Sequence, residues 1–328
     1  MNDFQKYIHI SKYARWMDEK GRRENWDETV GRYIEFFRNR PRVKNADHPH
    51  MEADLGKLYN AIYNLEVLPS MRCFMTAGRA LERDEVAGYN CAAIAINNVR
   101  SFDEMFYLLM NGCGVGFSVE RQYINQLPSL PEELYDSESV IKVRDSKIGW
   151  ASSLKELIAS LYAGSVPTWD VSSVRPAGTR LRTFGGRASG PEPLISLFHF
   201  VVRTFRRGVS ERKEKLNSLE VHDICCKIAD TVIAGSVRRA ACISFSNLTD
   251  DRLRRAKVGD WYSVAPYRAL ANNSVAYTEK PDLDAFSKEW RTLYKSKSGE
   301  RGIVNKEALR AKAEGCGREW EGDYLLNP

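Results

Sequence analysis

Several features that would assign a chain to a familiar class are missing from this sequence. No apolar run approaches the roughly 18–20 residues of a membrane-spanning helix. The start, MNDFQKYIHISKY, lacks the charged and then apolar pattern of a signal peptide. Internal repeats and low-complexity tracts are also absent. We therefore expect a cytoplasmic protein with no membrane-bound part.

Cysteine is present, but not in the spacing of a zinc site or a disulfide framework. There are seven cysteines and no CxxC pair: Cys73, Cys91, Cys113, Cys225, Cys226, Cys242 and Cys316. An odd number of thiols in a chain of this length argues against a disulfide scaffold. We expect reduced thiols, most of them buried as small apolar side chains and one or two of them reactive.

Histidine is scarce as well. The five histidines (His9, His48, His50, His199 and His222) have no metal-ligand spacing. We expect no metal site, and we expect His199 and His222 to be packed or surface residues within helices.

The composition is that of a soluble globular protein with one large or two ordinary domains. Of the 328 residues, 43% are hydrophobic and 28% are charged. The formal net charge is +6. A basic chain suits an anionic ligand such as a nucleotide, or a nucleic acid, although an arginine-rich solvated surface is the simpler interpretation.

The first 66 residues are expected to be helical. Asn25 and Glu28 have the spacing of a capping box, and Val30, Ile34 and Phe37 follow at helical intervals. A second pattern, MEADLGKLYNAIYNL, places Leu55, Leu58, Ile62 and Leu65 on one face of a helix. We therefore treat residues 1–66 as a helical N-terminal region.

From residue 67 to 328, short apolar strands alternate with amphipathic helices, which indicates an α/β fold with much parallel sheet. Strands are expected at 91–97 (a buried strand), 116–120, 168–172, 239–246, 273–278 and 302–305, and helices at 101–112, 149–164, 190–208, 219–235 and 282–296. Ser101 with Glu104, and Ser189 with Glu192, have capping-box spacing, and Gly112 is expected to end its helix. In the helix at 149–164, Leu154, Leu157, Ile158 and Leu161 are expected to face inward.

The glycine-rich stretch NGCGVGFSVE, residues 111–120, follows a helix and precedes a strand. A dinucleotide-binding loop has the opposite order, so that phosphate meets a helix N-terminus. The Rossmann interpretation therefore fails. What remains is a helix end at Gly112, and backbone at Gly114 and Gly116 that a ligand can approach closely.

Four further motifs could bind an anion or present a thiol, but each also has a plain structural interpretation. Ser70 follows a proline and precedes Arg72, as in a phosphate-binding turn or an ordinary one. Asn90 and Cys91 stand at the start of a strand. The pair Arg238-Arg239 follows a Gly-Ser turn, where one arginine could reach a phosphate. The stretch RPAGTRLRTFGGRASGPEPL is either an anion-binding helix start or a long surface loop.

The combination of motifs is more specific than its parts. KYARWMDEKGRRENWDETV, PSMRCFMTAG, AGYNCAAIAI, NGCGVGFSVERQ, VRDSKIGW, RPAGTRLRTFGGRASGPEPL, VHDICCKIADTVIAGSVRRAA, NNSVAY and GERGIVN occur in this order. Together they resemble the N-terminal half of an adenosylcobalamin-dependent (class II) ribonucleotide reductase, and the opening block resembles the triphosphate reductases of that class.

This resemblance implies a helical N-terminal region followed, over 67–328, by the first half of a ten-stranded α/β barrel. In the family, the residue after the terminal Asn-Pro is the cysteine that becomes a thiyl radical, and the catalytic glutamate follows closely. The resemblance thus implies that the chain stops one residue short of the radical cysteine. The second half-barrel, most of the cobalamin-binding surface and the C-terminal redox cysteines would lie beyond it.

The resemblance also implies roles for individual residues. Cys91 would be one thiol of the reducing pair, and Asn327 would hold a ribose hydroxyl. Asn90 and the backbone of Cys113 and Gly114 would line the ribose, and Ser70 would contact the substrate phosphates. The effector site would include the loop from Gly235 through Ser236 to Arg238 and Arg239, helped by Arg121, Asp145 and Ser146.

Two departures from the family pattern bear on regulation and assembly. No ATP-cone region precedes the first helices, so we expect no overall activity control by ATP or dATP. The stretch between Pro128 and Asp145 is short. A long insertion there would let a monomer mimic a dimer interface, so the short stretch argues against a monomer and leaves a homodimer as the open alternative.

Three hypotheses for the function follow. In the first, the chain is part of a reductase for ribonucleoside triphosphates or diphosphates, completed by a C-terminal half through assembly or through protein splicing by a split intein. Its partners would then be ribonucleotide substrate, a deoxynucleotide or ATP effector, adenosylcobalamin bound mostly by the other half, and a thioredoxin-type reductant. In the second, the chain is a stand-alone nucleotide-binding module. In the third, its basic surface binds nucleic acid. Intact motifs at both the substrate and effector positions favour the first.

Overall fold

The computed structural model describes residues 1–44, 49–179, 187–234 and 241–317. The chain divides into two compact units, Met1–Asn90 and Cys91–Pro328. The sequence-based boundary lay at residue 66, but the short helices between residues 71 and 88 belong to the first unit. Phe74 of one of these helices packs into the core of the first unit with Val30 and Ile34, which explains the later boundary.

The first unit is built mainly from helices. Its elements are α1 (Asp3–Ile8), the π-helix η1 (His9–Tyr13), β1 (Trp16–Met17), η2 (Asp18–Lys20), β2 (Arg22–Arg23), α2 (Trp26–Arg38), α3 (Pro41–Lys44), α4 (Met51–Tyr63), α5 (Met71–Thr76), α6 (Arg79–Arg83) and η3 (Glu85–Gly88). The capping box of α2 is confirmed, because the Asn25 and Glu28 side chains each accept a backbone N–H of the other residue. On α4, Leu55 and Ile62 are buried as expected. Leu58 is exposed, and Leu65 lies beyond the end of the helix, so the predicted apolar face is shorter than expected.

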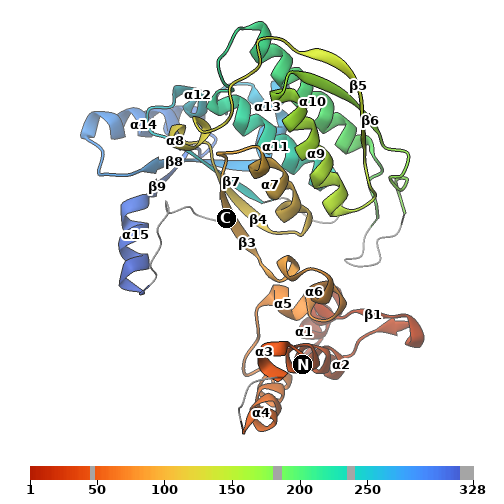
Figure 1. The fold of residues 1–328 in the computed structure, drawn as a ribbon. Helices are drawn as coiled ribbons and strands as arrows, with labels where there is room; N and C mark the ends of the chain where they lie inside the picture. The colour runs from red at the N-terminus through yellow and green to blue at the C-terminus, as the bar shows by residue number, and fades with distance from the viewer. Residues whose placement is uncertain (45–48, 180–186, 235–240, 318–328) are drawn as a thin grey trace. The chain divides into compact units, whose positions relative to one another are not determined.

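The second unit contains a five-stranded sheet of order β3-β4-β7-β8-β9 in which every neighbouring pair is parallel (Figure 1). Its strands are β3 (Cys91–Ala95), β4 (Gly114–Ser118), β7 (Cys242–Asn247), β8 (Ala271–Tyr277) and β9 (Gly302–Asn305). The prediction of an α/β fold with parallel sheet is confirmed. The expectation that the strand at 91–97 is buried is wrong, because β3 is an edge strand of this sheet and its residues are only partly covered.

Helices cover the sheet in two layers (Figure 1). Helices α7 (Arg100–Met110) and α11 (Ser218–Ala234) pack on the strands, and α9 (Lys147–Tyr162) and α10 (Glu192–Ser210) pack on these helices. A parallel pair, β5 (Tyr135–Lys142) and β6 (Ser165–Asp170), lies against α9. Leu154, Leu157, Ile158 and Leu161 of α9 are fully buried, as predicted. The remaining elements are α8 (Arg121–Ile124), α12 (Asp251–Arg254), α13 (Trp261–Val264), η4 (Pro266–Leu270), α14 (Leu283–Ser296) and α15 (Lys306–Gly315).

Two predicted helix starts are wrong. Helix α7 begins before Ser101, because the Asn98 side chain accepts the Arg100 N–H at 2.8 Å and sets the start earlier. Helix α10 has Pro191 as its N-cap residue, and the Ser189 hydroxyl donates to the Gly190 carbonyl instead of capping. The predicted stop at Gly112 is confirmed, since Asn111 ends α7 and Gly112 has a φ of 79° that favours glycine.

A buried ion pair links the segments that follow β4 and β9. Lys306 Nζ lies 2.6 Å from Glu120 Oε2, and both side chains are almost fully buried. The Ser118 hydroxyl also donates to Glu120 Oε2, over 2.8 Å. In the sheet, β7 and β8 lie between β4 and β9. Strands β4 and β9 are therefore separated by three strand spacings of ~4.8 Å each. The ion pair therefore crosses the carboxyl ends of the two central strands.

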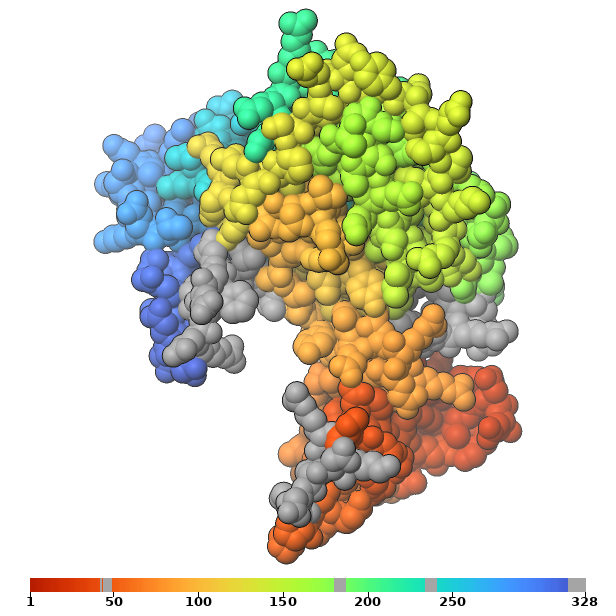
Figure 2. Space-filling model, in the orientation of Figure 1, coloured from red at the N-terminus to blue at the C-terminus, as the bar shows by residue number. Residues whose placement is uncertain are grey.

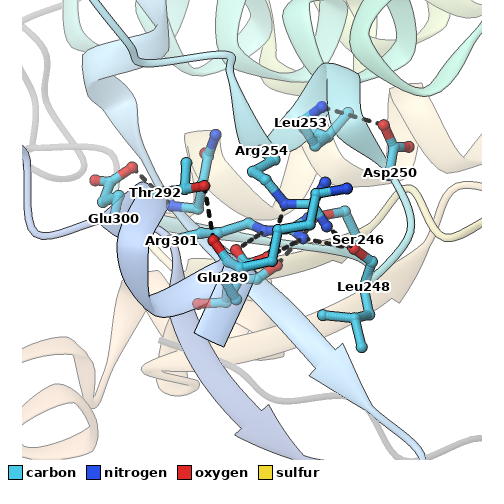
Figure 3. A network of polar contacts seen from close by, with 12 residues as sticks. Ser246, Leu248, Asp250, Leu253, Arg254, Glu289, Thr292, Glu300 and Arg301 are labelled. Atoms are coloured by element: carbon cyan, nitrogen blue, oxygen red, sulfur yellow. Dashed lines mark hydrogen bonds and ion pairs between the residues drawn. The ribbon is translucent and has the colours of Figure 1, made fainter. Parts of the chain in front are cut away.

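A second buried network fixes α14 over the end of the sheet (Figure 3). Glu289, the one buried residue of this fully described helix, accepts hydrogen bonds from Arg254 and Arg301. Arg301 also donates to the Ser246 hydroxyl and to the Leu248 carbonyl, 2.9 and 3.0 Å away. Burial raises the pKa of Glu289, but the two arginines outweigh it, so the pKa of this carboxyl is lowered. The inward face of α14 is thus held by charge rather than by apolar packing.

Candidate active site and effector site

The amino-terminal edge of the five-stranded sheet brings together three of the predicted site residues. Cys91 is the first residue of β3 and stands in register with Gly114, the first residue of β4. Cys113 directly precedes β4 and is 2% exposed. Cys91 is only half-buried, whereas Cys113 is buried. A partly accessible thiol beside glycine backbone is suited to thiol chemistry on a ligand that lies along this edge.

The turn that leads into β4 is sharply defined. Gly112 takes a left-handed conformation, and its N–H bonds to the Leu109 carbonyl at 2.8 Å. The Cys113 N–H bonds to the Leu108 carbonyl at 3.1 Å. These two bonds satisfy the last carbonyls of α7 and send the chain directly into the strand.

Three buried thiols of the second unit are poor nucleophiles. Cys225 and Cys226 are fully buried in α11, and burial raises the pKa of each well above its usual value. Burial also raises the pKa of Cys242, at the start of β7, to about 12. A cysteine–histidine–aspartate cluster within α11 is structural, since His222 has no exposed surface and Asp223 is held by Arg268 at 2.6 Å. The expectation that His222 is a packed residue is confirmed.

We predict that alkylation of the native protein at pH 8 separates these thiols. Cys91 and the exposed Cys316 should react, while Cys225, Cys226 and Cys242 should not, because only the thiolate is nucleophilic. Peptide mass spectrometry after brief exposure to iodoacetamide measures this, and the urea-unfolded chain, in which every thiol should react, is the control. Modification of Cys242 as fast as Cys316 would contradict the assignment.

Ser70 and Asn90 belong to the first unit. Ser70 is the exposed N-cap residue of α5, where its carbonyl accepts the Phe74 N–H at 2.8 Å and its hydroxyl makes no capping bond. Asn90 is exposed, and its Oδ1 accepts a long hydrogen bond of 3.4 Å from Nε of the buried Arg72. Asn90 directly precedes Cys91 in the sequence. Arg72 is therefore the described side chain that orients Asn90.

Asp145 and Ser146 lie at the start of α9. Ser146 is its N-cap residue and accepts the Gly149 N–H at 3.0 Å. Asp145 forms an ion pair with Arg175 Nε over 2.7 Å. The sequence gives no signal for this pairing, because Arg175 lies 30 positions from Asp145, in a motif that could be an anion-binding helix start or a long surface loop. Carboxylate, hydroxyl and guanidinium groups thus gather where the helix dipole favours an anion.

Arg121 lies elsewhere. It opens α8 after β4, where its N–H bonds to Asn247 Oδ1 at 2.7 Å, beyond the carboxyl end of the sheet. The start of α9 is next to the other end of β4, since Lys147 bonds to Asn111. Arg121 and Asp145 are therefore at opposite ends of the same strand.

A hollow of about 470 Å³ lies between α7 and α9. Ile148, two residues beyond Ser146, lines it together with Tyr107, Leu108 and Lys155. Asp103 also lines it, and burial raises the pKa of this carboxyl.

The remaining predicted site residues, Gly235, Ser236, Arg238, Arg239 and Asn327, lie outside the described residues. Among the described residues, no group of three His, Cys, Asp or Glu side chains is placed to hold a metal ion. No helix in the described part of the chain is long and apolar enough to cross a membrane.

Two family models match the chain. That of the ribonucleotide reductase alpha domain matches residues 1–79, and that of the insertion domain of B12-dependent ribonucleotide reductases matches residues 118–205. The second match includes the short stretch between Pro128 and Asp145.

Curated relatives are adenosylcobalamin-dependent ribonucleoside-triphosphate reductases. That of Lactobacillus gasseri is 29% identical over 365 residues, covering 91% of this chain and 48% of the relative. That of Lactobacillus leichmannii is 30% identical over 356 residues, covering 89% and 47%. A crystal structure of a B12-dependent (class II) ribonucleotide reductase superposes with a TM-score of 0.76 at 28% identity, covering 91% of this chain and 48% of that one. The chain spans about half the length of the curated relatives it matches.

Proposed function

Because the chain belongs to the B12-dependent (class II) ribonucleotide reductases, we propose that it supplies the substrate and effector sites of such an enzyme. The reaction converts a ribonucleoside triphosphate to the deoxyribonucleotide for DNA synthesis. The observation that carries this proposal is the register of the half-buried Cys91 opposite Gly114 at the amino-terminal edge of a parallel sheet.

Cys91 would be one of two thiols that reduce the ribose. A thiyl radical on a cysteine of the remaining half removes the 3′-hydrogen, and a carboxylate takes the 3′-hydroxyl proton. The 2′-hydroxyl leaves as water, and two electrons come from the dithiol, which becomes a disulfide. The second thiol would be supplied by the remaining half, and a thioredoxin-type protein would reduce the disulfide.

The substrate would lie along the edge that carries Cys91. The backbone of Cys113 and Gly114 would line the ribose, since Gly114 has no side chain to hold it away. Asn90, held by Arg72, would contact the sugar, and the hydroxyl of Ser70, which makes no capping bond, would contact the phosphates. Asn327 would bind a ribose hydroxyl.

The effector, a deoxynucleotide or ATP, would bind at the start of α9. Ser146 and the first N–H groups of α9 suit a phosphate, and Arg175 adds a cation while it orients Asp145. The loop from Gly235 to Arg239 would carry the signal to the substrate. Arg121 would act only indirectly, because it lies at the other end of β4.

Surfaces of the second unit support a function that needs the rest of the reductase. Leu283, Phe286, Trp290 and Tyr294 form an apolar stripe on α14, and Trp290 and Tyr294 are 56% and 79% exposed. Helix α14, in blue, lies at the surface of this unit in Figure 2. Strands β3 and β9 are the edge strands of this sheet, and each pairs on one side only within the described part of the chain. Such edges and patches are usually covered in a functional assembly, and we propose that the second half of a barrel covers them.

Adenosylcobalamin, when bound, supplies the radical that the thiol chemistry requires. We propose that the remaining half binds most of the cofactor, while this chain supplies most of the contacts to the substrate.

The isolated chain is therefore expected to show no turnover. The remaining half can be supplied on the same chain, by protein splicing or as a second polypeptide. The completed protein should then convert ribonucleoside triphosphate in the presence of adenosylcobalamin and a dithiol. Chromatographic measurement of deoxyribonucleotide tests both statements. Turnover by the isolated chain would contradict the need for a second half. Nucleotide binding without turnover in the completed protein would favour a nucleotide-binding module, and binding of single-stranded DNA alone would favour a nucleic-acid-binding function.

A further inference from the structure

A hydrogen bond joins the start of α9 to the turn that leads into β4. Lys147 Nζ donates to Asn111 Oδ1 over 2.6 Å. Lys147 directly follows Ser146, the N-cap residue of α9. Asn111 is the C-cap residue of α7 and lies three positions before Gly114, the first residue of β4. The bond thus connects the proposed effector site with the turn that leads into the proposed ribose site.

Asn111 is placed so that its position determines the turn. It is 1% exposed, its side-chain Nδ2 donates to the Tyr107 carbonyl at 3.1 Å, and its own N–H bonds to the Tyr107 and Leu108 carbonyls. The next two N–H groups, of Gly112 and Cys113, bond to Leu109 and Leu108. A shift of Asn111 would therefore be passed to Cys113 and Gly114, because each link in the turn is hydrogen-bonded.

The position of Lys147 makes this bond sensitive to an anion. Its ammonium group is disfavoured by the dipole of α9, whose amino end is positive, and favoured by the dipole of α7, whose carboxyl end is negative. A phosphate bound beside Ser146 would reverse the balance and attract the ammonium group toward α9. The buried Asn111 Oδ1 would then lose a charged donor, which is unfavourable unless the turn adjusts.

We propose that Lys147 is a positioning residue that couples effector binding to substrate choice by holding or releasing Asn111. This inference rests on the proposed function and adds the route by which its two sites communicate. The coupling is reciprocal, so the substrate should change effector affinity by the same factor as the effector changes substrate affinity.

The test is a titration of the full chain with its remaining half by calorimetry. Ribonucleoside triphosphate affinity is measured with and without a deoxyribonucleoside triphosphate. In the wild type we expect a ratio of about 5–150-fold, the usual size of such couplings. In Lys147→Met the ratio should fall close to one, while the affinity for the substrate alone stays within about twofold. Lys147→Arg, which keeps a cationic donor, should retain most of the coupling.

Two further variants separate this role from a merely structural one. Asn111→Asp pairs Lys147 with a carboxylate, so a higher effector concentration should be needed to release it. Lys155 lies about two turns further along α9 than Lys147. Lys155→Met also removes one positive charge from α9, but at a distance from Asn111, so it should keep the wild-type ratio of substrate affinities. A wild-type ratio in Lys147→Met would overturn the coupling and leave the proposed function intact. A wild type that binds neither nucleotide would overturn the proposed function, and the coupling with it.

Discussion

Replacing Cys91 with serine is expected to abolish multiple turnover in the completed reductase. Serine has nearly the same shape, so the edge of β3 and its register with Gly114 should persist. The reaction takes two electrons from a pair of thiols, which become a disulfide. A serine hydroxyl cannot form this disulfide and so cannot supply the electrons. We expect turnover to fall on the order of 10³-fold or more, as when a covalent catalytic residue is removed. Substrate binding should stay within about twofold.

The readouts are deoxyribonucleotide formed per active site and substrate affinity. Cys316→Ser is the matched control, because this exposed thiol lies in the segment after α15 and away from the sheet. It should keep full activity. Multiple turnover by Cys91→Ser above about a tenth of the wild-type rate would show that another thiol reduces the ribose.

Replacing Glu289 with alanine is expected to destabilise the second unit by about 3–5 kcal/mol, the usual cost of leaving a buried charge without its partner. Two arginines, Arg254 and Arg301, would lose the carboxylate they share (Figure 3). Because native domains are stable by only ~5–15 kcal/mol, this one change should remove a large share of the free energy of unfolding. Urea denaturation followed by circular dichroism measures it.

The control is Asp284→Ala, an exposed acidic residue on the same helix, which should change stability by less than ~0.5 kcal/mol. The pH dependence gives a second readout. Because the pKa of Glu289 is lowered in the folded state, its contribution is present above the pKa of the unfolded chain and is lost as the pH falls toward the folded value. A loss below about 1 kcal/mol in Glu289→Ala would show that α14 is held mainly by other contacts.

Local signals in the sequence predicted local structure well where one interaction dominates. The capping box of Asn25 and Glu28, and the buried stripe of α9, depend on residues a few positions apart and are confirmed. The capping-box pattern misled at Ser101, because Asn98 competes for the same helix start three residues earlier. Spacing alone cannot rank two such caps.

Long-range contacts were beyond the sequence reasoning. The bond between Lys147 and Asn111 joins residues 36 positions apart, and that between Arg301 and Ser246 joins residues 55 apart. The sequence around each residue contains no signal that identifies the residue it bonds to. The expected burial of the strand at 91–97 failed for a related reason: its composition is that of a central strand, whereas its place at the edge of this sheet depends on strand order. The resemblance to reductases supplied the site residues that patterns alone left open.

The Glu120–Lys306 pair has a mechanical consequence. It ties the segments after β4 and β9 across the carboxyl ends of β7 and β8, and both charges are buried, so separating them is costly. An elastic sheet that is clamped at one end deflects most at the other. Small changes in strand spacing should therefore be largest at the amino-terminal edge, where Cys91 and Gly114 lie, and smallest at the tied end.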